Sequence, residues 1–289
     1  MQGAGLATPA SEVRPAGPPR PAHGWGGRSV QGLAALLGLF LALPVATLVV
    51  RAVVDGSLGN VLGSPVVLDA LALSLLTTAA SLVITVALGL PLALVLARHS
   101  FPGSSLIEAV IDLPIILPPS VAGLSLLLVF GRSGLLGPAL DALGIEIPFT
   151  TLAVVLAQTF VSAPLFIRSA RSGLAGVDGD VEDAARVDGA SELRLLRSVT
   201  IPLASSALSA GLVMSWGRSL GEFGATIMFA GNVAGRTQTL PLVVYGAFEA
   251  GDLDSSIAAA AILVVAAFGV LVAVRTFHWS RALELHNLG

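Results

Sequence analysis

The sequence predicts an all-α, polytopic membrane protein with six transmembrane helices. Of its 289 residues, 55% are hydrophobic and only 11% are charged, whereas a soluble domain carries about 25% charged residues. The mean hydropathy is +0.90. Several long runs are continuously apolar, which is typical of membrane helices, because a helix satisfies all of its own backbone groups in hydrocarbon. The strands of a membrane β-barrel would alternate apolar and polar residues instead.

Six apolar stretches approach or exceed the roughly 20 residues that a helix needs to cross the hydrocarbon core of a bilayer. They cover residues 30–54, 70–97, 107–130, 150–166, 204–228 and 255–274. The first stretch could also be a cleaved signal peptide. Its uncharged run, residues 29–50, is longer than the roughly 7–15 residues of a signal peptide's apolar region. We therefore interpret it as a retained helix.

The placement of arginine predicts the orientation. All fifteen basic side chains are arginine, and with the N-terminus inside, eleven of them fall on the cytoplasmic side and three outside. The cytoplasmic set is Arg14, Arg20, Arg28, Arg98, Arg168, Arg171, Arg186, Arg194, Arg197, Arg275 and Arg281, and the outer set is Arg51, Arg132 and Arg236. Because cytoplasmic loops carry the excess of positive charge, we expect both termini on the inner side of the cell membrane.

On this basis the chain divides into four parts. Residues 1–28 are rich in Pro, Gly and Ala and are expected to form a disordered cytoplasmic arm. Residues 29–69 hold the first span and an external loop. Residues 70–276 form the transmembrane core, which includes a charged loop at 177–203, and residues 277–289 form a cytoplasmic tail.

Missing residue types exclude several kinds of chemistry. The chain has no lysine and no cysteine, so it lacks the lysine of a phosphate-binding P-loop, thiolate nucleophiles and cysteine ligands for zinc. Its four histidines, at positions 23, 99, 278 and 286, are scattered near segment ends. We therefore expect no catalytic, cofactor or metal site in this chain, and no nucleic-acid partner.

Two other classes of membrane protein are alternatives. An ion-coupled secondary transporter often carries inverted repeats and ion-binding carboxylates near the middle of the membrane, but the sequence shows no convincing internal repeat. An intramembrane enzyme would need a histidine or a pair of carboxylates beside a serine within the spans. Serine and threonine are plentiful there without such companions, and their ordinary role is hydrogen bonding between helices.

The charged loop at 177–203 is predicted to contain two short helices. Asp180 is a suitable N-cap for a helix over 181–188, and Gly189 can end that helix with a positive φ. Ser191 can cap a second helix, whose end is marked by Pro202.

One face of the first predicted helix is small and apolar. Val181, Ala184 and Ala185 share that face at spacings i, i+3 and i+4, and the acidic Glu182 and Asp183 in the first turn complement the helix dipole. Such a helix can dock in a groove on a partner. An ordinary solvated loop remains the alternative interpretation.

The loop resembles the cytoplasmic signature of binding-protein-dependent ABC importer permeases. That signature runs Glu-Ala-Ala, three residues, Gly, nine residues and then hydrophobic-x-hydrophobic-Pro, and here its spacing is intact, with Asp183 in the usual Glu position. The resemblance implies a type I ABC importer permease fold, with the loop docking on a separate ATPase. The implied coupling residues are Glu182, Asp183, Ala184, Ala185, Arg186, Gly189, Ala190 and Pro202. Which of the two adjacent carboxylates makes the acidic contact stays open.

The segment 218–241 contains a second group of candidate residues. Arg218 and Glu222 stand at i and i+4 and can form an ion pair, while Gly221 and Gly224 permit close helix approach or a kink. The pair is either a structural brace or part of a gate that lines a translocation path, because ionisable groups in membranes usually face the bundle interior or a water-filled path. The candidate path residues are Arg218, Gly221, Glu222, Phe223, Gly224 and Thr226.

The same segment resembles the molybdate permeases. The resemblance lies in residues 221–226, 230–232 and 237–241, and in residues 112–114 and 117–119 of the third predicted span. Sulfate, thiosulfate and tungstate permeases are the alternatives. The resemblance implies two copies of the chain, two ATPase subunits that hold ATP and Mg²⁺, and an external substrate-binding protein. Candidate docking segments for that protein are 54–69, 131–147 and 231–254.

Overall fold

The computed structural model describes residues 28–56, 59 and 63–286, with side chains for residues 30–56, 59 and 63–272. The predicted arm as far as residue 27 and the last three residues of the predicted tail lie outside this range. All regular structure in the described residues is helical. The chain forms two compact units, Met1–Ala46 and Thr47–Gly289. Helix α1 (Arg28–Val54) corresponds to the first predicted span.

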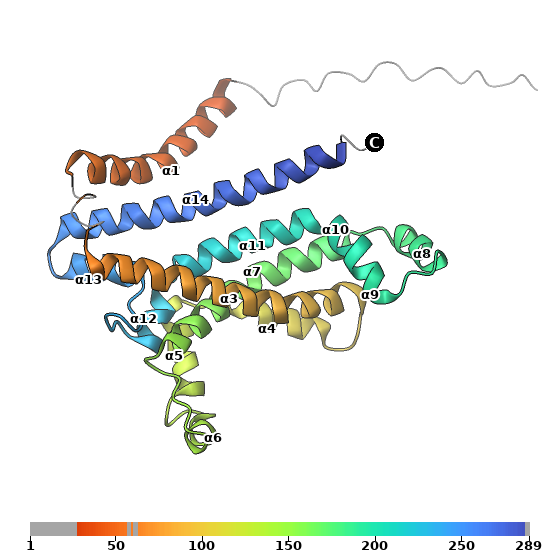
Figure 1. Cartoon of the computed structure of the whole chain (residues 1–289), viewed down its shortest axis with the longest axis horizontal. Coiled ribbons are helices and arrows are strands. Elements are labelled where there is room, and N and C mark those ends of the chain that lie inside the picture. The colour runs from red at the N-terminus through yellow and green to blue at the C-terminus, as the bar shows by residue number, and fades with distance from the viewer. Residues whose placement is uncertain (1–27, 57–58, 60–62, 287–289) are drawn as a thin grey trace, which may run out of the picture. The chain divides into compact units, whose positions relative to one another are not determined.

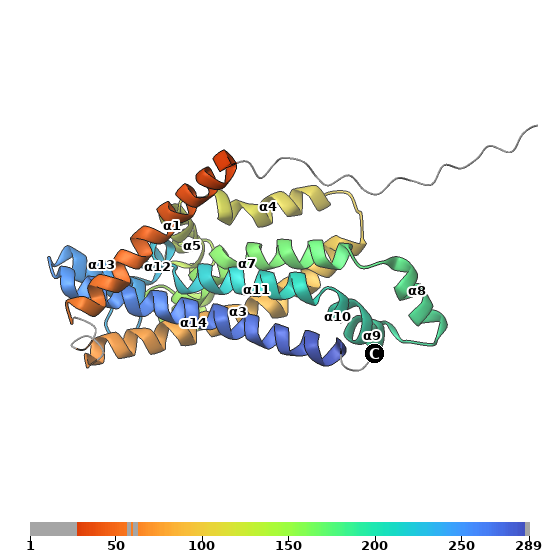
Figure 2. The ribbon, with the colours of Figure 1, turned by 90° about the horizontal axis from the view of Figure 1, so that it is seen from above.

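The second unit is built around three long helices. α3 (Pro65–Arg98), α7 (Thr151–Ala175) and α11 (Ser205–Leu220) pack against one another, and α14 (Leu253–His286) lies beside α11 (Figures 1 and 2). The short α13 (Leu240–Glu249) packs on α14 and α3. α8 and α9 lie at one end of this bundle, and α12 and α13 lie at the other (Figure 2).

The prediction that the third span is a single straight helix is wrong. Residues 107–130 form parts of two helices, α4 (Ser104–Ile116) and α5 (Pro119–Phe130), whose axes differ by 118°. Leu117 has extended backbone angles because it precedes Pro118. Pro118 and Pro119 both lack the N–H that would continue the helix, and Pro119 starts the next helix at a position where proline is favoured.

The fifth predicted span is also interrupted. At its start the chain bends by 73° between the segment Glu192–Leu203 and α11. Within it, three residues separate the end of α11 at Leu220 from the start of α12 (Gly224–Ala230). The buried Glu222 carboxylate accepts a hydrogen bond from the Ala225 N–H at 2.7 Å. The side chain thus serves the start of α12, and residues 204–228 form two helices instead of one.

Several helix ends differ from the predicted bounds. α7 continues nine residues past the predicted end at 166, and Arg168 and Arg171 lie within it. They pair with Asp112 and Glu108 of α4 at 3.6 and 2.8 Å. α3 begins at Pro65 instead of residue 70. α14 runs to His286, through most of the predicted tail at 277–289. The predicted loops at 131–147 and 231–254 contain α6 (Gly137–Ala142) and α13.

Four helices of the described residues are long and apolar enough to cross a membrane, and the count rises to six if each bent pair is one span. Hydroxyl groups connect these helices in the interior. Ser215 donates to the Ser162 carbonyl at 2.8 Å, Thr159 donates to Ser81 at 3.1 Å, and Ser74 accepts from the Leu240 N–H at 2.7 Å. This confirms helix–helix hydrogen bonding as a role for serine and threonine in the spans.

Candidate functional site: a charged loop and a broken helix

The first helix of the charged loop is α8 (Gly179–Val187). Asp178, and not Asp180 as predicted, is its N-cap. Asp178 has extended backbone angles, and its carboxylate accepts a hydrogen bond from the Asp180 N–H at 3.0 Å. Asp180 and Glu182 then occupy the first turn, where negative charge complements the helix dipole.

The cap assignment gives a direct prediction. Asp178→Ala is expected to destabilise α8 by about 1 kcal/mol, because a helix N–H loses its acceptor. Amide hydrogen exchange over residues 179–187 should become faster. Asp180→Ala removes only a favourable charge from the first turn, so its effect should be smaller. A larger effect of Asp180→Ala would contradict the assignment.

The end of α8 is as predicted. Gly189 has φ +84°. The Gly189 N–H donates to the Arg186 carbonyl and the Ala190 N–H donates to the Ala185 carbonyl, each at 3.0 Å. This is the Schellman arrangement, in which a left-handed residue closes the helix. Glycine adopts that backbone conformation without the strain that a Cβ would cause.

The second helix of the loop is irregular. α9 (Glu192–Leu195) starts after Ser191, at the predicted position, and is followed by a π-helical segment, Leu196–Thr200, and by α10 (Ile201–Leu203). Pro202 lies inside α10, one residue before its end. π-helical turns are rare and frequently lie at functional sites.

The two adjacent carboxylates of α8 have different environments. Glu182 is only 5% exposed, and its Oε1 accepts hydrogen bonds from Arg98 Nη2 and Thr200 Oγ1, both at 2.6 Å. Asp183 is exposed and pairs with Arg186 at 2.8 Å. Glu182 therefore points into the fold, and Asp183 is the carboxylate of this pair that solvent or a partner can reach.

The outer face of the loop combines exposed apolar and charged groups. Val181, Val187 and Leu193 are 46%, 88% and 58% exposed. Arg186 pairs with both Asp183 and Glu192, and its hydrogen bond holds the pKa of the Glu192 carboxyl below its usual value. We call seven of the exposed residues of α8 and α9 the loop face, namely Val181, Asp183, Ala184, Arg186, Val187, Glu192 and Leu193.

At the other end of the bundle, the predicted ion pair between Arg218 and Glu222 forms, with Nη1 and Oε2 2.5 Å apart. The Glu222 side chain is 1% exposed and that of Arg218 is 34% exposed. Thr226 is fully buried, whereas Gly221 is exposed. Phe223 packs against Tyr245 with ring centroids 4.8 Å apart. Of the six candidate path residues, Glu222 and Thr226 thus face the interior of the chain itself.

The start of α12 lies very close to α5. A Cβ on Gly224 would be 2.5 Å from the Pro119 Cβ, and a Cβ on Gly123 would be 2.6 Å from the Ala225 carbonyl oxygen and 2.7 Å from the Met228 Cβ. The prediction that Gly224 permits a close helix approach is confirmed. The two interrupted spans therefore meet where each of them restarts as a helix.

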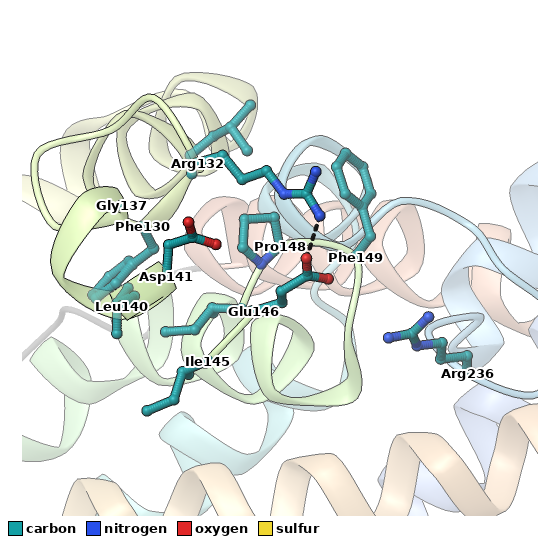
Figure 3. Close-up of a pocket in the computed structure, with 13 residues that line it drawn as sticks. Phe130, Arg132, Gly137, Leu140, Asp141, Ile145, Glu146, Pro148, Phe149 and Arg236 are labelled. Carbon is teal, nitrogen blue, oxygen red and sulfur yellow. Dashed lines mark hydrogen bonds and ion pairs between the residues drawn. The ribbon is translucent and has the colours of Figure 1, made fainter. Parts of the chain in front are cut away.

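Two of the predicted docking segments, 131–147 and 231–254, also come together. Thr151, at the start of α7, donates from its Oγ1 to the Arg236 carbonyl at 2.9 Å. Both segments contribute to the lining of a cavity of about 400 Å³, the second through Arg236 (Figure 3). Arg132 and Glu146 form an ion pair beside it, and Arg236 lies apart from that pair (Figure 3). Phe149, at the cavity wall, has φ +60°, an unusual conformation for a bulky residue.

No cluster of three His, Asp or Glu side chains able to hold a metal occurs in the described part of the chain. A charged loop and interrupted apolar helices do not by themselves identify a family, but the sequence matches a known one. Residues 89–281 match the family described as the binding-protein-dependent transport system inner membrane component. The chain belongs to this family.

Individual members of the binding-protein-dependent family show the same relationship. The molybdenum transport system permease protein ModB of Mycobacterium tuberculosis is 42% identical over 244 residues, which cover 84% of this chain and 91% of that protein. The sulfate transport system permease protein CysW of Synechococcus elongatus is 38% identical over 78% of this chain and 80% of its own length.

A solved structure confirms the fold. The crystal structure of a bacterial ABC transporter involved in the import of the polysaccharide alginate contains a chain with a TM-score of 0.69, 15% identity, and coverage of 88% of this chain and 94% of that one. The fold class predicted from the sequence, a helical ABC importer permease, is therefore correct.

Several residues that contact the candidate sites were not identified from the sequence. Arg98 and Thr200 lie 84 and 18 residues from Glu182, and no local pattern connects them. Glu108 and Asp112 did carry a signal. They are carboxylates one turn apart in an otherwise apolar segment, and Arg168 and Arg171 are similarly spaced on α7.

Proposed function

We propose that the chain is the membrane-spanning subunit of an ATP-driven importer whose substrate is molybdate. The observation that carries the proposal is the 42% identity to molybdenum permeases over 84% of the chain. The sulfate permeases, at 38% identity or less over comparable lengths, make sulfate the second candidate. Both are tetrahedral oxyanions with two negative charges.

The loop face is the proposed contact with the ATPase. It offers apolar side chains beside the exposed Asp183 and Arg186, a combination that fits a groove with both apolar and charged walls. ATP and Mg²⁺ would be held by the partner, since this chain has no lysine for a P-loop. Two ATPase subunits would move two copies of α8, and the copies of the bundle would rock between inward and outward access.

In this proposal, the contact between the loop face and the ATPase sets the orientation of the chain in the membrane. α8 and α9 lie on the cytoplasmic side with both termini, and α6, α12 and α13 lie on the outer side. An external binding protein would dock on the segments around Arg132 and Arg236, next to the cavity in Figure 3. Arg218, one third exposed, is the candidate cation on the path between the two copies.

Reconstitution in proteoliposomes tests the function. The chain is incorporated with the P-loop ATPase and the exported binding protein expected from neighbouring reading frames, and uptake of molybdate is measured with ATP inside the vesicles. We expect uptake that depends on ATP and stops when the ATPase carries a substitution of its P-loop lysine. Uptake driven by an ion gradient without ATP would overturn the proposal. ATP-dependent uptake of sulfate, with molybdate neither transported nor competing, would favour the second candidate.

A further inference from the structure

We propose that Glu182 is a positioning residue that joins the ATPase-contacting helix α8 rigidly to the end of membrane helix α3 and to the π-helical segment Leu196–Thr200, which leads into α11. The inference rests on the proposed function, because it assigns a task to α8 within an ATP-driven importer. Its test includes a measurement that does not depend on the transported substrate.

The geometry brings three elements to one oxygen atom. Glu182 Oε1 accepts from Arg98 Nη2 at 2.6 Å and from Thr200 Oγ1 at 2.6 Å. Arg98 is the last residue of α3. Thr200 is the last residue of the π-helical segment, from which α10 leads into α11. Displacement of α8 must therefore either carry the ends of both segments along or break charge-assisted hydrogen bonds.

Burial makes breaking these bonds unfavourable. The Glu182 side chain is 6% exposed and that of Arg98 is 26% exposed, so a separated carboxylate would not be fully rehydrated. A buried charge that loses its partner is strongly unfavourable, and charge-assisted hydrogen bonds are stronger than neutral ones. The three elements are therefore expected to move as one body.

The other charged groups of the loop do not provide such a connection. Arg186 pairs with Asp183 and Glu192, which all belong to the loop itself. His99, Arg186 and Glu192 line the same cavity as Glu182. Among the described residues of the loop that line this cavity, Glu182 is the one that accepts a hydrogen bond from α3, through Arg98. Glu182 and Asp183 thus have separate tasks, the first toward the membrane helices and the second toward the partner.

The first test compares variants in the reconstituted importer. Glu182→Gln keeps the side-chain shape and an acceptor for Thr200 but removes the charge that Arg98 binds. We expect normal copurification with the ATPase, ATP hydrolysis within about twofold of wild type, and at least a fivefold loss of molybdate imported per ATP. Asp183→Asn should instead weaken copurification. Asp188→Asn, an exposed substitution at the end of α8, is the matched control and should behave as wild type.

A double-variant cycle addresses the contact itself. The two side chains act through one interaction. The double variant Glu182→Gln with Arg98→Gln should therefore import as much molybdate per ATP as the more impaired of the two single variants, or more. Effects of the two substitutions that multiply would overturn the proposal. So would wild-type import per ATP in Glu182→Gln, or a loss of ATPase binding as large as that in Asp183→Asn.

The second measurement needs only the ATPase and nucleotide. The chain has no cysteine, so spin labels can be attached uniquely at Asp180→Cys, which lies on α8 outside the loop face, and at Leu88→Cys on α3, both exposed positions. In the parent protein the distance between the labels should be the same with and without ATP. With Glu182→Gln, it should change or broaden on ATP binding. An unchanged distribution in the variant would overturn the inference, whereas failure to bind any ATPase would overturn the proposed function instead.

Discussion

Gly123→Val is expected to destabilise the permease by about 1–3 kcal/mol or more, which is the usual cost of forcing extra methyl groups into a packed interior. A Cβ at this position would be 2.6 Å from the Ala225 carbonyl oxygen. That oxygen belongs to the backbone of α12, so the clash cannot be relieved by a change of rotamer. The helix itself would have to move away from α5.

The reciprocal substitution tests the same crossing from the other helix. Gly224→Val would place its Cβ 2.5 Å from the Pro119 ring, which is rigid and starts α5. Thermal unfolding of the detergent-solubilised protein should show a lowered midpoint for both variants. Gly269→Ala in α14 is the control, because in the described part of the chain no atom beyond its own stretch of helix lies within 4 Å of the position of its Cβ. If Gly123→Val and Gly224→Val are as stable as this control, the close crossing is not present in the protein.

Glu222→Ala is the second substitution for which we expect a large effect. It removes the ion pair with Arg218 and the acceptor for the Ala225 N–H. Loss of one partner from a fully buried pair costs about 3–5 kcal/mol. Because the Arg218 side chain is 34% exposed and can be hydrated, we expect a smaller loss of about 2 kcal/mol.

Glu222→Gln separates the two contributions. The amide oxygen can still accept from Ala225, while the charge is gone. Thermal unfolding midpoints should fall in the order wild type, Glu222→Gln, Glu222→Ala. Equal midpoints for the two variants would mean that the hydrogen bond to Ala225 contributes nothing, and an unchanged midpoint for Glu222→Ala would contradict the structural role of the carboxylate altogether.

Composition and apolar runs sufficed to predict a helical membrane protein, because hydrocarbon admits few alternatives to a long apolar helix. The same runs did not reveal the interruptions. Pro118 and Pro119 do indicate the interruption between α4 and α5, because consecutive prolines cannot continue a helix. The second interruption depends on the Glu222 carboxylate, which accepts a hydrogen bond from the Ala225 N–H three residues further on, and an acidic residue after a glycine indicates no such contact by itself.

The charged loop shows a different kind of limit. Its spacing predicted the helix, the positive φ of Gly189 and the start after Ser191, since these follow from local backbone preferences. Asp178 and Asp180 are the same residue type two positions apart, so sequence preference cannot choose the cap between them. Whether Glu182 or Asp183 faces the fold depends on Arg98, 84 residues away, and only tertiary structure brings that partner close.

The hydroxyl-rich interior has a consequence for biogenesis. α7 is the least hydropathic and the most enclosed of the four long candidate spans in the described residues, and it carries the fully buried Gln158 and the two arginines near its end. Lipid alone is a poor solvent for such a helix, since charged residues in a span oppose insertion. α3, which packs along it and is more apolar, offers it the Ser81 hydroxyl, which accepts a hydrogen bond from Thr159, and the Leu96 carbonyl, which accepts from Arg171. The helix at the centre of the bundle is therefore expected to enter the membrane stably only after its neighbour is in place.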